Sequence, residues 1–380
     1  MLPRTLFSSE HEDFRRTIRR FFDEEVTPNQ EHWEEQGMVP RELWNRAGEL
    51  GFLCMGVPEE YGGLGADKLF GIVLMEEKAH SRSTSTNFEV HSDIVGGYIQ
   101  HFGTEEQKRH WLPKMATGEA VGSLAMTEPS GGSDLQAIKT RAVKDGDDYI
   151  INGTKIFISN GWHADVIVLA VQTGDTREGK NDISLILVEG DRPGLSKGKP
   201  LKKIGLKGQD TVELFFDNMR VPQSNLLGGK EGQGFKQLMQ ELAFERLTVA
   251  IQSVQAARSA LELTIEYTNN RKVFGKSVSS YQNARFKLAE MKSEIAIAQV
   301  FVDRCIELSL QHKLTGEASA TAKYWVSELY CRVVDECVQL HGGYGYMLEY
   351  PIARAYCDAR ASRIYLGANE IMREIVARTL

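Results

Sequence analysis

The sequence predicts an α+β protein built from three consecutive parts: a helical domain over residues 1–120, an antiparallel β domain over 121–231 and a helical bundle over 232–380. Two observations lead to this prediction. Apolar residues recur at helical spacing toward both ends of the chain and at strand spacing in its middle. Both changes of period fall in connections that contain glycine or proline, where domains commonly join.

The first third has helical periodicity. Apolar side chains recur over Phe14–Phe22 and again over Leu43–Leu50, and Pro40 stands where a helix can begin. Residues Gly56–Gly65 interrupt the pattern with glycines and a proline, so we expect a loop there. The segment therefore predicts helices joined by a turn-rich connection.

Short β-branched and aromatic runs, separated by turn sequences, fill the middle part. They occupy residues 140–144, 149–151, 155–158, 166–171, 183–188 and 212–216. Asp145–Asp148 and Asn152–Gly153 are typical of hairpin turns, so the pattern predicts a small antiparallel barrel or sandwich. No strand is followed at once by a long helix and no G-x-G-x-x-G occurs, which disfavours a dinucleotide-binding Rossmann unit.

After Gly232 the helical period returns and continues to the C-terminus. The long stretches 235–269, 281–312 and 317–340 keep this period without interruption. Helices of such length derive most of their stability from packing an apolar face. The last part is therefore predicted to be a helical bundle.

Composition and charge exclude several classes of function. A net charge of −7 argues against nucleic acid as the main partner, since phosphate binding needs a basic face. No apolar run approaches the roughly 18 residues of a membrane span, and no signal-peptide core begins the chain. We expect a bacterial cytoplasmic protein or a mitochondrial matrix protein after removal of a transit peptide. The cysteines and histidines show neither C-x-x-C nor H-E-x-x-H spacing, so we expect no catalytic metal.

One carboxylate stands in an apolar stripe. Leu238, Leu242, Glu245 and Val249 are spaced by four, three and four residues, which places them on one face of a helix. Burial raises the pKa of a carboxyl group and makes the ionised form a stronger base, suited to a weakly acidic proton beside a carbonyl. The alternative is a glutamate at the rim of the helix, paired with a lysine or arginine.

Two loop motifs lie in the β region, at residues 125–134 and 155–161. Each alone is compatible with an ordinary hairpin loop, although the backbone amides of such loops can hold an anion or line a flat ring. Together, A-M-T-E-P-S-G-G-S-D and K-I-F-I-S-N-G closely resemble the acyl-CoA dehydrogenase family. The resemblance continues at residues 57–63, 271–276, 339–346 and 365–371 and so covers nearly the whole chain.

The resemblance implies FAD bound without a covalent link between the β domain and the bundle, where it would receive a hydride from the substrate β-carbon. The residues expected to line the isoalloxazine ring are Met126, Thr127, Phe157 and Ser159. Those expected to meet the adenosine diphosphate half, in part from a neighbouring subunit, are Arg271, Phe274, Gln282, Gln339 and Gly343. We therefore expect a homo-oligomer, a tetramer. In a monomer, Arg271 and Lys272 would instead be a solvated charge pair.

The resemblance also bears on the catalytic base. In many family members the base is a glutamate directly before the glycine of a terminal loop, and here that position is Leu366. Relatives that act on long straight chains or on isovaleryl-CoA carry the base on a helix with a Glu-Arg pair, which here is Glu245-Arg246. We therefore expect Glu245 to be the base, with the Leu366 backbone amide bound to the thioester carbonyl. Glu241, four residues earlier, is a rival base or a rim acid.

Further contacts follow from the same resemblance. The residues expected to bind the substrate are Ser133, Arg246, Tyr365 and Gly367. An ordinary ion pair is the alternative role of Arg246. Glu370 would neighbour the cofactor at a helix start, where Ala368 replaces the family's common threonine. Its alternative role is a carboxylate favoured by the helix dipole.

The expected reaction is the dehydrogenation of a long-chain acyl-CoA to the trans-2-enoyl-CoA, with electron-transfer flavoprotein as electron acceptor. Two alternatives stay open. One is an acyl-CoA oxidase-like flavoenzyme that is reoxidised by O₂, although such oxidases typically have a further helical domain. The other is a catalytically silent, CoA-binding member of the family.

Overall fold

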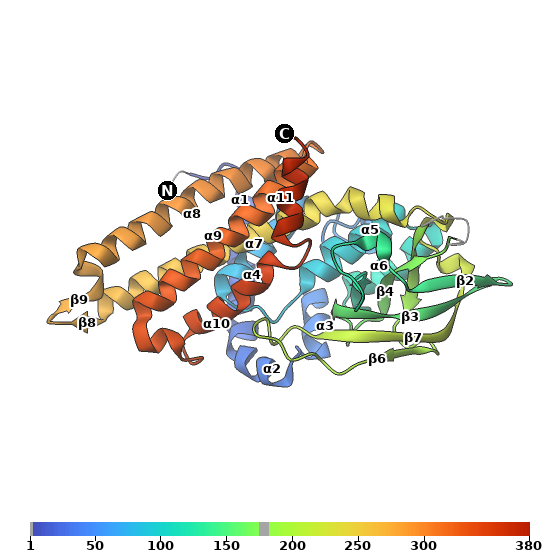
Figure 1. Cartoon of the computed structure of the whole chain (residues 1–380), viewed down its shortest axis with the longest axis horizontal. Helices are drawn as coiled ribbons and strands as arrows, with labels where there is room; N and C mark the ends of the chain where they lie inside the picture. The colour runs from blue at the N-terminus through green and yellow to red at the C-terminus, as the bar shows by residue number, and fades with distance from the viewer. Residues whose placement is uncertain (1–2, 175–181) are drawn as a thin grey trace.

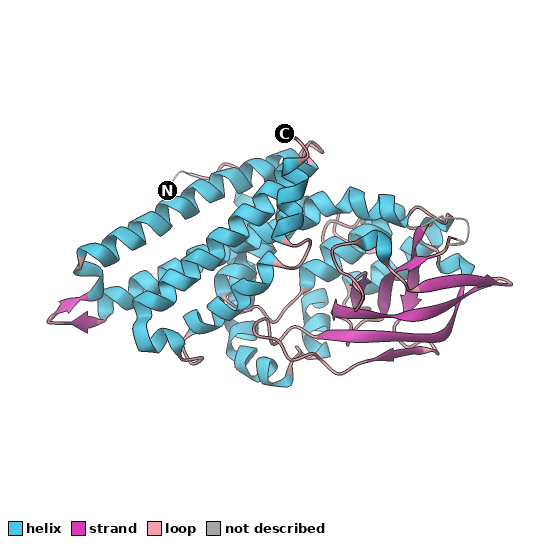
Figure 2. Ribbon diagram, in the orientation of Figure 1, coloured by secondary structure: helices cyan, strands magenta, loops and turns pink. Residues whose placement is uncertain are grey.

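The computed structural model describes residues 3–174 and 182–380 and contains the three predicted parts, with the N-terminal helices lying between the C-terminal bundle and the β domain (Figure 1). Helices form the first and last parts and strands the middle one (Figure 2). The change from helix to strand falls between Ala116 and Gly122, and the return to helix falls between Pro222 and Gly234. This confirms the α+β fold class. The domain limits proposed at residues 120 and 231 lie within these two connections and stay a prediction.

The first four of the N-terminal α-helices pack around buried aromatic residues, among them Phe22, Trp44 and Phe88, and the two that follow pack in a second cluster that includes residues of the sheet. These helices are α1 (Ser9–Phe21), α2 (Gln30–Gln36), α3 (Arg41–Glu49), α4 (Lys68–Ser81), α5 (Gly96–Phe102) and α6 (Glu105–Ala116). Pro40 caps the start of α3, as the sequence predicts. A π-helical segment, Val90–Val95, leads directly into α5. π-Helical turns are rare and frequently mark functional sites.

The middle part is one sheet with the strand order β1-β4-β2-β3-β7-β6, and β5 pairs with β4. The strands are β1 (Gly122–Ala125), β2 (Arg141–Asp145), β3 (Asp148–Ser159), β4 (Val166–Gln172), β5 (Ile183–Glu189), β6 (Leu195–Lys197) and β7 (Thr211–Pro222). The hairpin pairs are antiparallel, as predicted, but β4 runs parallel to β1 and, at one residue pair, to β2. The sequence pattern did not indicate these parallel pairings.

The predicted turn at Asn152–Gly153 is wrong. Both residues lie inside β3, where the register with β7 shifts between Ile151 and Gly153. Gly153 has φ of +152°, and a side chain there would meet Thr140 at 2.5–2.7 Å. The dipeptide therefore forms a bulge, because close packing on Thr140 requires a glycine within a continuous strand.

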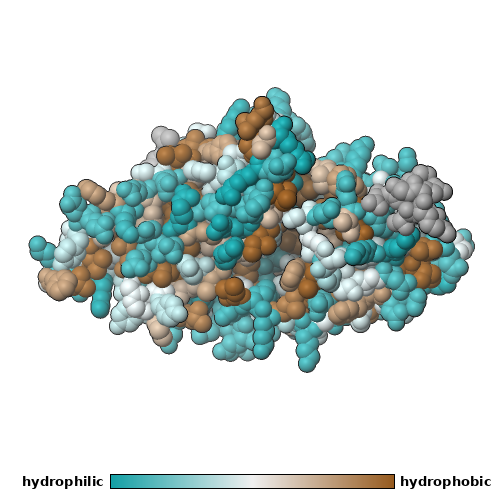
Figure 3. All heavy atoms as spheres, viewed as in Figure 1, coloured by the Kyte–Doolittle hydropathy of each residue, from teal (hydrophilic) through white to brown (hydrophobic). Residues whose placement is uncertain are grey.

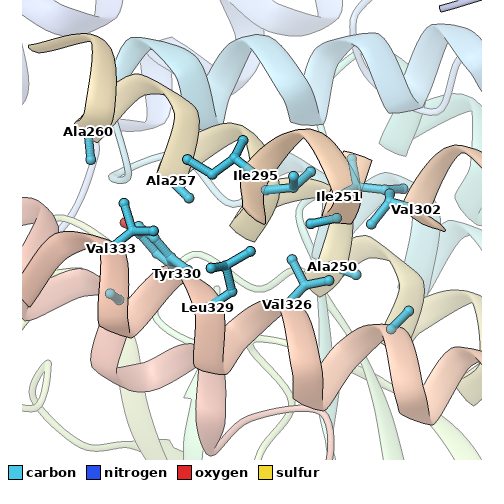
Figure 4. Packing of buried hydrophobic residues seen from close by; sticks show 14 of the residues in the cluster. Ala250, Ile251, Ala257, Ala260, Ile295, Val302, Val326, Leu329, Tyr330 and Val333 are labelled. Atoms are coloured by element: carbon cyan, nitrogen blue, oxygen red, sulfur yellow. The ribbon is translucent and has the colours of Figure 1, made fainter. Parts of the chain in front are cut away.

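The C-terminal part is a bundle built on α7 (Gly234–Asn270), α8 (Gln282–Leu310) and α9 (Gly316–His341). The predicted stretches match these helices within two residues at each end. Small residues such as Ala250, Ala257 and Ala260 let the helices approach closely, and larger apolar side chains such as Ile295, Leu329 and Val333 fill the space between them (Figure 4).

The long helix α7 runs from the β domain, past the N-terminal helices, to the far end of the C-terminal bundle. It begins beside β5, crosses α4 and α5, packs along α9, and ends at the small hairpin of β8 (Lys272–Val273) and β9 (Lys276–Ser277) at the far end of the molecule (Figure 1). The chain then ends with α10 (Pro351–Ala359), a terminal loop and α11 (Asn369–Ala377), which packs on α9.

Candidate functional site

Glu245 lies in the interior of the protein, on the apolar face of α7. Its side chain is 2% exposed, and Leu238, Leu242 and Val249 on the same stripe are also buried. The Tyr98 hydroxyl, from α5, donates a hydrogen bond to Glu245 Oε1 at 2.9 Å. The second carboxylate oxygen, Oε2, is buried and has no hydrogen-bond partner among the described residues. No lysine or arginine in the described part of the chain forms an ion pair with either carboxylate oxygen, which argues against the rim ion pair.

The surroundings of Glu245 shift its acidity toward neutral pH. Burial, which has the largest effect, and the nearby charge of Glu241 both raise the pKa of this carboxyl group, which is about 7 overall. The hydrogen bond from Tyr98 and the charge of Arg246 act in the opposite direction. A carboxylate with this pKa and a free oxygen can accept a proton at neutral pH.

Glu241 differs from Glu245 in both exposure and partner. Its side chain is 18% exposed and lies 2.9 Å from the His101 Nδ1 atom, at a partly open surface. A solvated carboxylate with an imidazole partner has little reason to take a proton from carbon. The geometry therefore supports Glu245 over Glu241 as the base.

Arg246 is half-buried, and its Nε atom has no hydrogen-bond partner in the described part of the chain. Burial lowers the pKa of its guanidinium, and the charge of Glu245 raises it. An arginine left with an unpaired, buried N–H is available for a ligand, because such a donor is costly to leave unsatisfied. This arrangement supports the substrate role over the ordinary ion pair.

The terminal loop holds residues with uncommon backbone geometry. Leu366 has φ of 51° and Gly367 has φ of 92°. The Leu366 side chain packs against the large buried cluster of which Tyr98, the hydrogen-bond partner of Glu245, is a member. Tyr365 is 39% exposed beside them. Glu370 is exposed in the first turn of α11, where the helix dipole favours a carboxylate.

The residues expected at the flavin ring lie at the ends of β1 and β3. The Ile156 backbone amide donates to the Thr127 carbonyl at 2.9 Å, which joins the two motifs. The buried Lys155 side chain donates to the Met126 carbonyl at 2.9 Å and to Glu128 Oε1 at 2.8 Å. Ser159 lies at the end of β3, where its carbonyl accepts a hydrogen bond from the Ser123 hydroxyl at 2.7 Å.

Phe157 presents an aromatic ring at this place. It is 64% exposed and has φ of 61°, a left-handed conformation that non-glycine residues rarely adopt. Such strain persists only where the surrounding structure imposes it, commonly at ligand sites. An exposed ring beside backbone amides fits a flat aromatic cofactor such as a flavin. The nearby Ser133 is exposed in the loop after β1, where a ligand can reach it.

The residues expected to contact the adenosine diphosphate half of FAD lie at the far end of the helical bundle, away from the strands. Arg271 and Phe274 belong to the β8–β9 hairpin, and Gln282 begins α8 next to it. The Arg271 guanidinium stacks on the Tyr344 ring at 5.5 Å and forms no ion pair among the described residues. Phe274 has φ of 47° and is 96% exposed. Gln339 and Gly343 are exposed at the same end of the bundle.

One chain therefore does not bring the two sets of cofactor residues together. The β8–β9 hairpin and the flavin-side strands lie toward opposite ends of the molecule (Figure 1). Between them, apolar surface lines a hollow at the junction of the bundle and the β domain (Figure 3). An unpaired arginine beside an exposed aromatic ring fits a pyrophosphate and an adenine, provided that a second copy of the chain supplies the hairpin.

Sequence reasoning missed two residues that the fold brings to this site. Tyr98 binds Glu245, and Lys323 on α9 donates to the Gly367 carbonyl of the terminal loop at 2.7 Å. Each lies far along the chain from its partner and outside any motif. In the sequence, each is a polar residue among apolar residues of a helix. The same pattern is typical of ordinary core residues, so it does not indicate a role in the site.

Residues 3–174 and 182–380 contain no group of three or more side chains that could together bind a metal ion. Within the same ranges, no helix has both the length and the apolar character that a bilayer crossing requires.

The chain matches three domains of one family. These are the acyl-CoA dehydrogenase N-terminal domain at residues 8–119, the middle domain at 123–219 and the C-terminal domain at 232–380. The mitochondrial long-chain specific acyl-CoA dehydrogenase of Sus scrofa is 50% identical over 378 residues, which cover 99% of this chain and 88% of that protein.

Solved structures agree with the sequence match. The crystal structure of acyl-CoA dehydrogenase from Geobacillus kaustophilus is 48% identical and superimposes with a TM-score of 0.97 over 99% of both chains. An acyl-CoA dehydrogenase from Bacillus anthracis complexed with FAD is 34% identical, with a TM-score of 0.92 over 98% of this chain and 67% of that one.

Proposed function

The chain belongs to the acyl-CoA dehydrogenase family and is an FAD-dependent oxidoreductase, and from this premise we propose that it converts long-chain acyl-CoA thioesters to trans-2-enoyl-CoA with Glu245 as the base. The observation that carries the proposal is the buried carboxylate of Glu245, with one oxygen bound to Tyr98 and the other free. In this reaction the saturated acyl chain loses a proton from its α-carbon and a hydride from its β-carbon, which leaves a double bond between the two carbons. FAD, when bound, supplies the hydride acceptor.

The protein residues act on the proton and on the carbonyl. Glu245 takes the α-proton, and Tyr98 fixes the orientation of its carboxylate through Oε1. The backbone amide of Leu366 stabilises the negative charge that develops on the thioester oxygen. The apolar cluster that contains Tyr98 and receives Leu366 excludes water, which strengthens both interactions.

The chemical step is expected to depend on the ionisation of Glu245. Since its pKa is raised to about 7, the rate of flavin reduction should fall about tenfold for each pH unit below that value and level off above it. Rapid-mixing measurements of flavin absorbance from pH 5 to 9 test this prediction.

Glu241→Gln is the matched control for the pH profile. It removes a charge that raises the pKa of Glu245, so the midpoint should move to lower pH while the plateau rate is kept. A profile without a midpoint between pH 6 and 8 in the parent enzyme would contradict the assignment of the base.

We place FAD with its ring at Met126, Thr127, Phe157 and Ser159, and its adenosine diphosphate half at the hairpin of a second subunit. The separation of the hairpin from these strands supports a homo-oligomer, and we propose the tetramer. Exposed apolar residues on α8, namely Phe286, Ile297 and Val300, support an interface along this helix. Gln339, Gly343 and Glu370 are proposed as further contacts to the cofactor.

The preference for long acyl chains is supported by the 50% identical relative and by a cavity of about 120 Å³. The cavity lies between α4, α5 and α7, and its walls include Gly97 and Phe244, the neighbours of Tyr98 and Glu245 in sequence. Its lining includes the apolar side chains of Phe52, Met55 and Leu74, and also charged groups such as Lys68, Asp93 and Glu241. We propose that it receives the distal part of the acyl chain.

Gly97→Leu is expected to shorten the preferred chain. A side chain at Gly97 meets no atom within 4 Å at its Cβ, so leucine can occupy the cavity. We expect kcat/KM for hexadecanoyl-CoA to fall about tenfold or more and that for octanoyl-CoA to change little, as displaced methylenes lose binding in an apolar pocket. Gly97→Ala is the control, with a smaller effect. An unchanged ratio between the two substrates would place the acyl chain elsewhere.

The experiment that tests the proposed function is anaerobic reduction of the bound flavin by acyl-CoA thioesters of graded length. We expect bleaching that is fastest with long chains. A colourless protein, or a yellow one that no acyl-CoA bleaches, would favour the catalytically silent alternative. We propose electron-transfer flavoprotein as the acceptor. Rapid hydrogen peroxide release in air would instead indicate the oxidase-like alternative. The cytoplasmic location stays a prediction.

A further inference from the structure

Lys323 is a fully buried lysine in the N-terminal third of α9. Its side chain is 0% exposed, although burying an ammonium group is costly unless its donors are satisfied. Its Nζ atom donates to the Gly367 carbonyl at 2.7 Å and to Asn369 Oδ1 at 2.9 Å. Both acceptors belong to the terminal loop or to the residue that follows it. The lysine therefore ties the loop to the core of the bundle.

Asn369 extends this connection. It is 1% exposed at the first residue of α11, and its Nδ2 atom donates to Ser327 Oγ at 3.0 Å and to Glu328 Oε1 at 3.1 Å. Glu328 in turn pairs with Arg363, just before the loop, at 3.0 Å. Residues of α9 thus hold the chain on both sides of Leu366 and Gly367.

The loop needs such support because its backbone is strained. Leu366 has φ of 51°, which a residue with a Cβ atom adopts at a cost, and Gly367 has φ of 92°. A strained conformation persists only where neighbouring groups fix it. The hydrogen bond from Lys323 to the Gly367 carbonyl fixes the Gly367–Ala368 peptide, and so anchors the left-handed turn formed by Leu366 and Gly367 at its C-terminal side.

We propose that Lys323 is a positioning residue that holds the Leu366 amide at the place of the thioester carbonyl. The inference rests on the proposed function, in which that amide stabilises the developing negative charge. Hydrogen-bond donors of this kind act only within a narrow range of distance, and a displacement of about 1 Å can cost about 100-fold in rate. The Lys323 side chain is fully buried and donates to the terminal loop and to Asn369, so it acts through the loop.

The charges around Lys323 allow it to donate at neutral pH. Burial lowers its pKa to about 8, and the charge of Arg246 acts in the same direction. Glu370 on α11 and Glu328 on α9 oppose this effect. The ammonium group is therefore still mostly protonated at pH 7.

The test is Lys323→Met, which keeps the length and apolar stem of the side chain and removes its donors. In the holoenzyme we expect kcat to fall about 100-fold with KM changed less than about threefold, because the amide acts on the transition state. In the same holoenzyme, without substrate, we expect faster hydrogen exchange at the backbone amides of residues 365–368. The second readout does not depend on turnover.

Two further variants separate positioning from general destabilisation. Val326→Ala removes a buried side chain from the same helix, so it should lower thermal stability but leave kcat and loop exchange unchanged. Asn369→Ala leaves Lys323 bound to Gly367 and should give an intermediate loss of about tenfold. It also tests the proposal if Lys323→Met does not fold.

The outcomes are distinguishable. If the parent enzyme does not bleach with any acyl-CoA, the proposed function fails. If the parent bleaches and Lys323→Met retains both its kcat and its slow loop exchange, the positioning role is overturned. A kcat loss in Val326→Ala equal to that in Lys323→Met would also overturn it, since packing alone would then account for the effect.

Discussion

Glu245→Gln is expected to bind FAD normally and to lose about 10⁴-fold in the rate of flavin reduction by acyl-CoA. The amide is nearly the same size as the carboxylate and can still accept the hydrogen bond from Tyr98, so the site should keep its shape. It cannot take a proton from carbon, and general bases contribute up to about 10⁴-fold. Anaerobic rapid mixing, with the flavin absorbance as the signal, measures this loss directly.

The same variant provides a check on folding that is independent of turnover. The usual pKa of 4.5 applies to the unfolded chain, whereas the folded pKa is about 7. Between pH 4.5 and 7 the carboxyl group is ionised in the unfolded chain but still protonated in the folded protein, so the free energy of unfolding declines as pH rises. Above pH 7 the loss of stability is complete and no longer changes with pH. Removing the charge should therefore stabilise the variant relative to the parent by about 3 kcal/mol more at pH 8 than at pH 4.

Glu241→Gln is the matched control for this experiment, because it changes a neighbouring carboxylate one helical turn away that faces His101. It should keep a high rate of flavin reduction. Rapid bleaching in Glu245→Gln, or a loss of bleaching in Glu241→Gln alone, would reject Glu245 as the base.

Moving the carboxylate to the terminal loop is expected to restore part of the activity. In a Glu245→Gly background, Leu366→Glu should raise the rate of flavin reduction by about 100-fold over Glu245→Gly alone. Leu366 packs against the cluster that contains Tyr98, the partner of Glu245, so a carboxylate there enters the same apolar environment. Single-turnover reduction with a long-chain acyl-CoA measures the recovery.

Leu366→Gln in the same Glu245→Gly background is the control for this restoration. It has the same shape as glutamate but cannot act as a base, so it should show no recovery. Equal rates in the two double variants would show that the loop and the helix are not interchangeable positions for the base. Equal rates would leave the assignment of Glu245 in the parent enzyme intact.

Several features of the fold follow from local sequence. The helices α7, α8 and α9 match the predicted stretches because long, uninterrupted apolar periodicity leaves a helix few alternatives. The Asn152–Gly153 dipeptide shows the limit of such reasoning. Its residues are typical of a hairpin turn, yet contact with Thr140 places them in a bulge inside β3. The parallel pairing of β1 with β4 likewise depends on a partner that is distant in sequence.

The site divides in the same way. Glu245 can be identified from the sequence because a carboxylate stands where the helical pattern has apolar residues. The family resemblance indicates the two motifs on the flavin side. The sequence alone is compatible with either a substrate contact or an ion pair for Arg246, and its buried Nε, which has no partner among the described residues, favours the substrate contact. Tyr98 and Lys323 gave no usable signal, since polar residues within buried helices are common and their partners lie 147 and 44 residues away.

The sequence by itself determined the order of helical and β parts, the spans of the long helices and the presence of one out-of-place carboxylate, because each follows from periodicity along a short stretch of chain. Only the tertiary structure decided how that carboxylate ionises, how the terminal loop is held, and that the Arg271 hairpin lies apart from the flavin-side strands. These properties depend on burial and on contacts between distant segments. Solvent exclusion around Glu245, for example, comes from α5 and α7 packing together, and neither helix provides it alone.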